Sequence, residues 1–156
     1  MLIRRAEISD IPDILRLLVQ VCNVHQDIRP DIFQRNGVKY TESDLKELLT
    51  NERRPVWCAV EDGTFLGYCF CQWEEYHDSS VMMDRRELYI DDLCVDEGCR
   101  GQGIARELYE YVEIYAKEKG FDVVTLNVWC GNEGAMRFYE KAGLTPRNIM
   151  MEKKLC

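Results

Sequence analysis

Two hydrophobic periods alternate along this chain of 156 residues, and the alternation limits the fold more than any other feature of the sequence. Stretches in which every second residue is apolar suit strands, whereas apolar residues three or four positions apart suit helices. The two patterns follow one another from end to end, with no repeat and no linker rich in proline or serine. The sequence therefore predicts one mixed α/β domain over residues 1–156.

The local signals place six strands and four helices. The Asp62-Gly63 pair predicts a hairpin turn, because both residue types tolerate positive φ. Asp10 is expected to cap the first helix. The expected strands are 2–7, two arms within 55–73, 87–95, 121–128 and 144–155; the expected helices begin near residues 11, 43, 104 and 132; an irregular segment is expected at 24–40 and a polar loop at 74–86.

The net charge and the cysteines limit the possible binding partners and the cellular compartment. The net charge of -8 repels phosphate backbones and anionic lipids, so we expect no nucleic acid and no membrane partner, and a cationic small molecule is favoured. The start of the chain does not resemble a secretory leader. The eight cysteines include no C-x-x-C pair, which predicts free thiols in a cytoplasmic protein and no metal site.

A glycine-rich turn carries the strongest chemical signal. The run Arg100-Gly101-Gln102-Gly103-Ile104-Ala105 joins an expected strand to a long amphipathic helix. Glycines let a backbone approach a ligand closely, and the free N–H groups of a first helical turn bind anions, so a pyrophosphate fits here. The alternative is a plain bend between strand and helix. No G-K-[ST] follows and the spacing is not G-x-G-x-x-G, which points away from ATP and NAD.

Three motifs in order resemble the GCN5-related N-acetyltransferases. The turn R-G-Q-G-I-A fits the [QR]-x-x-G-x-[GA] signature; LYIDDLCV precedes it and N-E-G-A-M-R-F-Y-E-K-A-G-L follows it, so the resemblance covers residues 87–144. Cys99, Ala105 and Leu144 depart from the commonest residues of the pattern. The resemblance implies a mixed sheet splayed between its fourth and fifth strands, about four flanking helices, and acetyl-coenzyme A as the acetyl donor.

The resemblance also implies how the donor is held. Backbone N–H groups of residues 101–106 would bind the pyrophosphate, and the pantetheine arm would pair like an extra strand with residues 93–95, a bulge in that strand opening the slot for the thioester. Asn132 resembles an asparagine that contacts the cofactor arm, although it also suits a helix cap. The implied cofactor-binding residues are Leu93, Cys94, Val95, Arg100, Gly101, Gln102, Gly103, Ile104, Ala105, Arg106 and Asn132.

Three side chains are candidates for catalysis. Tyr139 matches the family's tyrosine near the thioester sulfur and would protonate the leaving thiolate, unless it is a plain core aromatic. Asp91, with Asp92 as second choice, would help to deprotonate the acceptor amine; because strand side chains alternate, only one of the pair is expected to face the thioester. The alternative is that both aspartates are solvated or pair with arginines 85 and 86.

The resulting prediction is an N-acetyltransferase that works by direct attack of a primary amine. A small cationic acceptor is favoured over protein N-termini or lysines, and a non-catalytic module that binds acetyl-coenzyme A is the rival from another class. A covalent route through Cys94 is disfavoured because no histidine lies near it in the sequence. Homodimers are common in the family.

Overall fold

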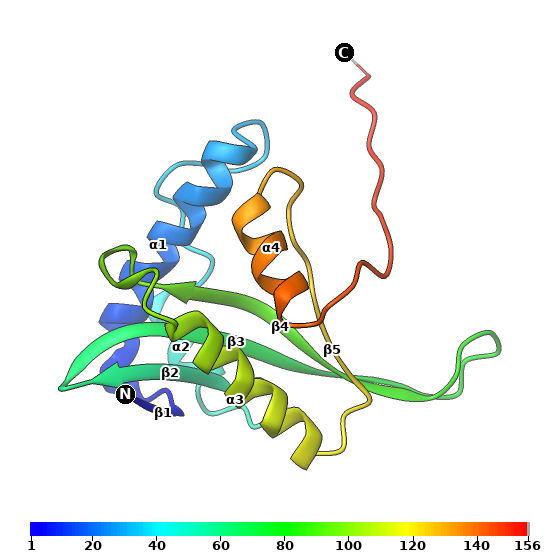
Figure 1. Ribbon diagram of the computed structural model, residues 1–156, viewed down its shortest axis with the longest axis horizontal. Coiled ribbons are helices and arrows are strands. Elements are labelled where there is room, and N and C mark those ends of the chain that lie inside the picture. Colours follow the sequence, from blue (N-terminus) through cyan, green and yellow to red (C-terminus); the bar gives the residue numbers. More distant parts are fainter. Residues whose placement is uncertain (156) are drawn as a thin grey trace.

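The computed structural model describes residues 1–155 and contains one five-stranded sheet with the strand order β1-β2-β3-β4-β5 (Figure 1). The first four strands pair antiparallel, and β5 pairs parallel to β4, as a mixed sheet requires. The strands are β1 (Leu2–Arg5), β2 (Val56–Glu61), β3 (Thr64–Tyr76), β4 (Arg85–Val95) and β5 (Val123–Leu126).

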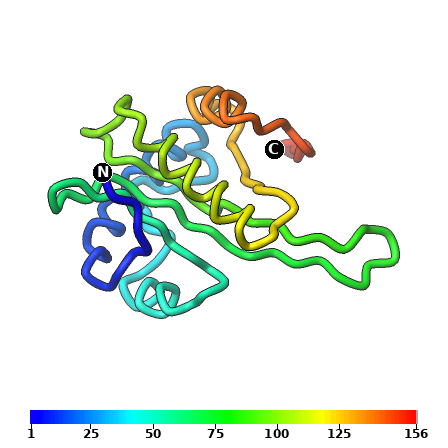
Figure 2. Tube along the Cα trace, turned by 60° about the horizontal axis from the view of Figure 1, so that its bottom comes forward, coloured from blue at the N-terminus to red at the C-terminus, as the bar shows by residue number. Residues whose placement is uncertain are grey.

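Helices cover both faces of the sheet, and Figure 2 shows α2 and α3 on opposite sides of it. One buried cluster joins α1 and α2 to side chains that include Tyr68 and Phe70 of β3; the other joins α3 to side chains that include Cys69 and Leu88. No helix among residues 1–155 combines the length and the apolar character that crossing a bilayer requires. The helices are α1 (Ile11–Ile28), α2 (Glu42–Leu48), α3 (Ile104–Glu118) and α4 (Glu133–Lys141), with 3-10 turns η1 (Ile8–Asp10) and η2 (Glu97–Cys99).

Two sequence boundaries differ from the structure. Helix α1 continues to Ile28, so the irregular segment starts about a turn later than residue 24, close to the helix breaker Pro30. The expected polar loop at 74–86 is shorter in the structure: β3 reaches Tyr76 and β4 begins at Arg85, so residues 77–84 close a long hairpin that projects from the body (Figure 1). Polar residues pair here because a projecting ribbon is solvated on both faces.

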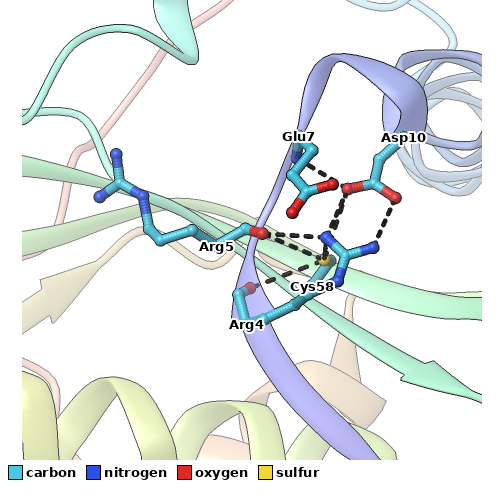
Figure 3. Close-up of polar contacts among 5 residues, drawn as sticks. All are labelled: Arg4, Arg5, Glu7, Asp10 and Cys58. Carbon is cyan, nitrogen blue, oxygen red and sulfur yellow. Dashed lines mark hydrogen bonds and ion pairs between the residues drawn. The ribbon is translucent and has the colours of Figure 1, made fainter.

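Asp10 stands at the N-cap of α1, but its carboxylate makes no capping bond to that helix. It accepts two hydrogen bonds from Arg4 at 2.7 and 3.0 Å and one from the Glu7 backbone N–H at 2.7 Å (Figure 3). Burial alone would raise the pKa of Asp10, but these hydrogen bonds lower it below its usual value. The carboxylate therefore ties β1 to the start of α1, beside the buried Cys58 thiol.

A bulge in β4 decides where the sheet opens. The pairing of β3 with β4 runs Phe70 with Asp92 and then Cys71 with Ile90, so Asp91 has no partner in β3. The parallel pairing of β4 with β5 stops at Ile90, directly before the bulge. Among residues 1–155, no strand pairs with the far edge of β4 from Asp91 to its end. This is the expected splay between the fourth and fifth strands.

The expected last strand, 144–155, is wrong. Residues 142–155 belong to no helix or strand, and Figure 1 shows this C-terminal tail leading away from α4 as an extended segment. Its sequence has the apolar character of a strand, but a strand also needs a neighbour for its backbone hydrogen bonds, and no described backbone group pairs with residues 145–155.

Candidate active site

A cleft of about 730 Å³ lies between the end of β4, the start of α3 and α4. It follows the splayed edge of β4 and ends against the glycine-rich turn. Eight of the eleven predicted cofactor-binding residues line it, while Cys94, Gln102 and Asn132 do not. The predicted residues that line the cleft are Leu93, Val95, Arg100, Gly101, Gly103, Ile104, Ala105 and Arg106.

The glycine-rich turn needs glycine for its backbone conformation. Gly101 and Gly103 have φ of 79° and 84°, in the left-handed region that other residues avoid. The bend places Gly103 at the N-cap of α3, and the Glu107 N–H donates to the Gly103 carbonyl at 3.1 Å. The N–H groups of residues 104–106 precede that first helical bond and stay available at the cleft. They suit an anion with several oxygens.

Cys94 points to the opposite face of the sheet from Leu93 and Val95. Its side chain belongs to the cluster around α1 and lies 3.7 Å from the Leu17 carbonyl oxygen. Burial raises the pKa of the Cys94 thiol to about 12, so the thiolate that a covalent mechanism needs is disfavoured. Cys94 is therefore a packed core residue, which agrees with the expectation that it takes no covalent part in the reaction.

Asn132 caps α4, because its side-chain oxygen accepts a hydrogen bond from the Ala135 N–H at 3.2 Å. The cap explains the residue type at this position on structural grounds. Contact with the cofactor arm stays a prediction. Gln102 lies exposed between the two glycines and contributes backbone rather than side chain to the turn.

Tyr139 lines the cleft from α4. Its ring meets those of Tyr109 and Phe138 edge to face, with centroids 6.2 and 5.0 Å apart. Within residues 1–155 its hydroxyl has no hydrogen-bond partner. Burial raises the pKa of Tyr139 well above its usual value, and the charge of Asp92 adds to the rise. The phenol therefore stays protonated and can donate a hydrogen bond into the cleft.

The alternation assumed for Asp91 and Asp92 does not hold at the bulge. Asp91 accepts hydrogen bonds from the Tyr40 hydroxyl at 2.8 Å and from Lys39 at 2.6 Å. Asp92 accepts one from the Tyr68 hydroxyl at 2.7 Å. The rings of Tyr40 and Tyr68 both pack on Phe70, so the two aspartates serve the same face of the sheet, the one covered by α1 and α2. Neither pairs with arginine 85 or 86.

The two carboxylates differ in their surroundings. Asp91 is held by an ammonium and a phenol, and its side chain is 15% exposed. Burial raises the pKa of Asp92 to about 6, although the hydrogen bond from Tyr68 opposes the rise. A carboxyl group with a pKa close to neutral can exchange a proton at physiological pH, which is the property of a general base.

Sequence reasoning missed the side chains that hold the aspartates. Tyr40 and Lys39 come from the irregular segment before α2, where no periodic pattern assigns them a face. Arg54 donates a hydrogen bond to the Tyr40 hydroxyl at 2.9 Å. Only Tyr68 carried a signal, because an inward position in the hairpin strand follows from alternation. Tyr109 and Lys141 also line the cleft.

Among the described residues no group of three or more histidine, cysteine, aspartate or glutamate side chains could hold a metal ion.

Comparison with known proteins gives a consistent result at the level of sequence. A family model described as Acetyltransferase (GNAT) family matches residues 18–144. The uncharacterized N-acetyltransferase YdgE of Bacillus subtilis is 33% identical over 128 residues, which are 79% of this chain and 78% of that protein. Thialysine N-epsilon-acetyltransferase of Bos taurus is 27% identical over 147 residues, 91% of this chain and 82% of the relative.

Solved structures show the same architecture. A crystal structure of a mutant BH1408 protein from Bacillus halodurans superposes with a TM-score of 0.96 at 31% identity, and the match covers 100% of both chains. An aminoglycoside acetyltransferase from an uncultured soil metagenomic sample superposes with a TM-score of 0.73 at 21% identity over 99% of this chain and 96% of the other, so it shares the fold.

Proposed function

This chain belongs to the GNAT family and is an acetyl-transferring enzyme, and from that membership we propose that it moves the acetyl group of acetyl-coenzyme A to the primary amine of a small molecule. The observation that carries the proposal is the bulge at Asp91. It leaves one edge of β4 open beside an anion-binding turn and brings two carboxylates to the opposite face of the same opening. We also propose that residues 1–156 form one acetyltransferase domain, and that its unbridged cysteines belong to a cytoplasmic protein.

The donor would lie in the cleft on the α3 side of the sheet. Its pyrophosphate would accept hydrogen bonds from the N–H groups of residues 101–106, and Arg100, Arg106 and Lys141 at the cleft would add positive charge near its phosphates. Its pantetheine arm would hydrogen-bond along the open edge from Leu93 to Val95, as a further strand would. The thioester would then lie where β4 and β5 separate, and a backbone N–H group near Leu93 would polarise the thioester carbonyl.

The acceptor would approach the splay from the face that carries the aspartates. An alkyl ammonium has a pKa near 10 and must lose a proton before its nitrogen can attack the carbonyl carbon. We propose that Asp92 takes this proton, directly or through water, in preference to Asp91, because Asp91 is already held by Lys39 and Tyr40. The new C–N bond replaces the C–S bond. Asp92 passes the first proton to water, and the second proton, which the nitrogen loses after the attack, replaces the one that Tyr139 gives to the departing thiolate.

Tyr139 of α4 would protonate the departing thiolate. Its phenol stays protonated and lacks another partner among residues 1–155, so its O–H is free to donate to sulfur as charge develops there. An acid and a base on opposite faces of one opening can act on the same reaction without a covalent enzyme intermediate, which supports direct transfer.

The acceptor class follows from charge. The net charge of -8 favours a cationic amine at long range. Close to the site, however, Lys39 pairs with Asp91, and Arg54 donates a hydrogen bond to the Tyr40 hydroxyl that binds the same carboxylate. These two cations also suit an amine that carries its own carboxylate, and one relative is named for thialysine. We propose a small amine of one of these two kinds over a peptide.

A thiol-release assay with acetyl-coenzyme A tests the proposal across polyamines, aminoglycosides, amino acids including thialysine, and peptides. We expect turnover with a small amine, and at least a tenfold loss of kcat in Tyr139→Phe with little change in donor KM. Lys39→Ala separates the two acceptor kinds, because it should raise KM for a carboxylate-bearing amine but not for a polyamine. Turnover with peptides alone would contradict the small-molecule acceptor.

A further inference from the structure

The two glycines of the turn at 101–103 stand clear of neighbouring atoms. A Cβ added at Gly101 or Gly103 would meet no atom within 4 Å, so no packing of side chains fixes the bend. One end of the turn continues into α3, and the other end continues into η2, which follows directly after β4. The direction of the N–H groups in the turn therefore depends on how firmly η2 is held.

Helix α1 holds η2 through two side chains that lie one turn apart. Arg16 pairs with Asp96, and the Gln20 side chain accepts a hydrogen bond from the Glu97 backbone N–H at 3.0 Å. Residues four positions apart share one face of a helix, so both contacts come from the same face of α1. Figure 1 shows the loop between β4 and α3 beside this helix. A helix packed on the sheet thus reaches the segment that leads into the pyrophosphate turn.

Asp96 connects these contacts to the turn. Its backbone N–H donates to the Leu66 carbonyl at 2.9 Å, its carbonyl accepts from the Cys99 N–H at 2.8 Å, and its side chain caps η2 by accepting a further backbone N–H at 3.0 Å. The hydrogen bond from Arg16 is the main cause that lowers the pKa of Asp96 below its ordinary value, so the carboxylate stays ionised. An ionised carboxylate next to a site for a diphosphate repels that ligand unless a cation offsets its charge.

We propose that Arg16 is a positioning residue for the acetyl donor, because it fixes η2 through Asp96 and offsets the charge of that carboxylate beside the pyrophosphate. Gln20 supports the same segment from the next turn of α1. Arg16 also pairs with Asp13 at 3.1 Å, so its own charge is balanced and it acts on the donor through Asp96. The inference rests on the proposed binding of acetyl-coenzyme A and adds to it a helix that contributes no residue to the cleft.

Donor kinetics of Arg16→Ala test the positioning role. We expect the KM for acetyl-coenzyme A to rise about fivefold with kcat unchanged, which is the size of effect that a partly exposed ion pair can support. S-acetylpantetheine lacks the pyrophosphate, so its KM should not change in this variant. Arg16→Lys keeps the charge and should recover most of the lost affinity. An equal rise in KM for the two donors would show a general loss of structure and would overturn the proposal.

Arg35→Ala is the matched control. Arg35 pairs with Asp27 near the C-terminal end of α1, and its side chain is 55% exposed, compared with 45% for Arg16. Each variant therefore loses one exposed arginine and one ion pair that involves α1. Because Arg35 makes no contact with η2, its removal should leave the KM for acetyl-coenzyme A unchanged within about twofold. A rise equal to that in Arg16→Ala would contradict a specific role for Arg16.

Calorimetry with coenzyme A separates this inference from the proposed function. In the background of Asp96→Asn, which has no charge to offset, Arg16→Ala should weaken the binding of coenzyme A by less than about twofold, compared with about fivefold in the wild-type background. Equal losses in the two backgrounds would show that Arg16 acts on the phosphates without Asp96, and the positioning role would be refuted. A wild type that binds no coenzyme A would remove the proposed function together with this inference.

Discussion

Asp92 combines a position at the opening of the sheet with a raised pKa. It sits beside the bulge, is bound by Tyr68 and lies close enough to Tyr139 to influence its pKa. Asp91, its neighbour, is engaged by a cation and a phenol. Adjacent carboxylates on one strand have therefore acquired different environments, and such divergence allows one of them to act as a base while the other positions its surroundings.

The raised pKa of Asp92 makes stability depend on pH. Its folded pKa of about 6 exceeds the ordinary value of 3.8, so the folded protein binds this proton more tightly than the unfolded chain. The stabilisation is complete below about pH 4 and is lost as pH rises through about 6. A difference of about two pKa units corresponds to about 3 kcal/mol as an upper bound.

Asp92→Asn should therefore have a higher Tm than the wild type at pH 8, and this advantage should vanish at pH 4. Thermal unfolding monitored by circular dichroism at both values measures the effect. Asp91→Asn is the control, because this variant loses an ion pair with Lys39 and should gain no stability at pH 8. An equal Tm difference for Asp92→Asn at both pH values would show that its proton affinity is not raised by folding.

At the scale of elements, local chemistry predicted more than distant pairing could. The Asp62-Gly63 turn has φ of 48° and 78°, as its residue types require. The turn at Gly101 and Gly103 was likewise found because its conformation depends on the residues that form it. The strand predicted at residues 144–155 is absent because a strand needs a pairing partner, and the sequence of the segment alone does not determine that partner.

The same distinction between local signals and long-range contacts applies to the candidate site. The cofactor turn and Tyr139 lie within one stretch of motifs and could be assigned by resemblance, although their roles stay predictions. Tyr40 and Tyr68 come from segments far from Asp91 and Asp92 in sequence, and only the folded sheet brings them together. The shared face of the two aspartates was also hidden, because an extra residue in one strand is defined by its pairing with the next.

Gly103→Ala tests the turn as an element. The substitution places a Cβ at φ of 84°, which costs about 1–2 kcal/mol, and relief of that strain would turn the N–H groups of α3 away from the pyrophosphate. We expect coenzyme A to bind roughly tenfold more weakly in calorimetry, which is about 1.4 kcal/mol. Gly98→Ala is the control, because its Cβ would meet only the Asp96 carboxylate at 3.6 Å. Equal affinities in the two variants would contradict the assignment.

At the scale of the whole molecule, the cleft and the long hairpin lie at separate places. The hairpin tip between Tyr76 and Arg85 projects beyond the body in Figures 1 and 2 and contributes no residue to the cleft. Its exposed apolar side chains are Val81, Met82 and Met83. The predicted single domain stays a prediction, whereas the sheet and the two layers of helices follow the alternating pattern of the sequence.

Replacing residues 77–84 by an Asn-Gly turn should leave acetyl transfer unchanged within about twofold and change the free energy of unfolding by less than about 1 kcal/mol, because the segment buries little and such pairs close hairpins well. Steady-state kinetics and urea unfolding measure both quantities. A marked rise in the KM of either substrate would place the tip in contact with the reaction and contradict this separation.

The bulge at Asp91 gives β4 one residue more than its partner strand needs, and the pairing of β4 with β5 stops directly before it. Deleting that residue would restore unbroken pleating, keep Asp92 on its present face because it would then alternate directly with Ile90, and let β5 pair further along β4. The opening at which donor and acceptor would meet thus results from one additional residue in β4.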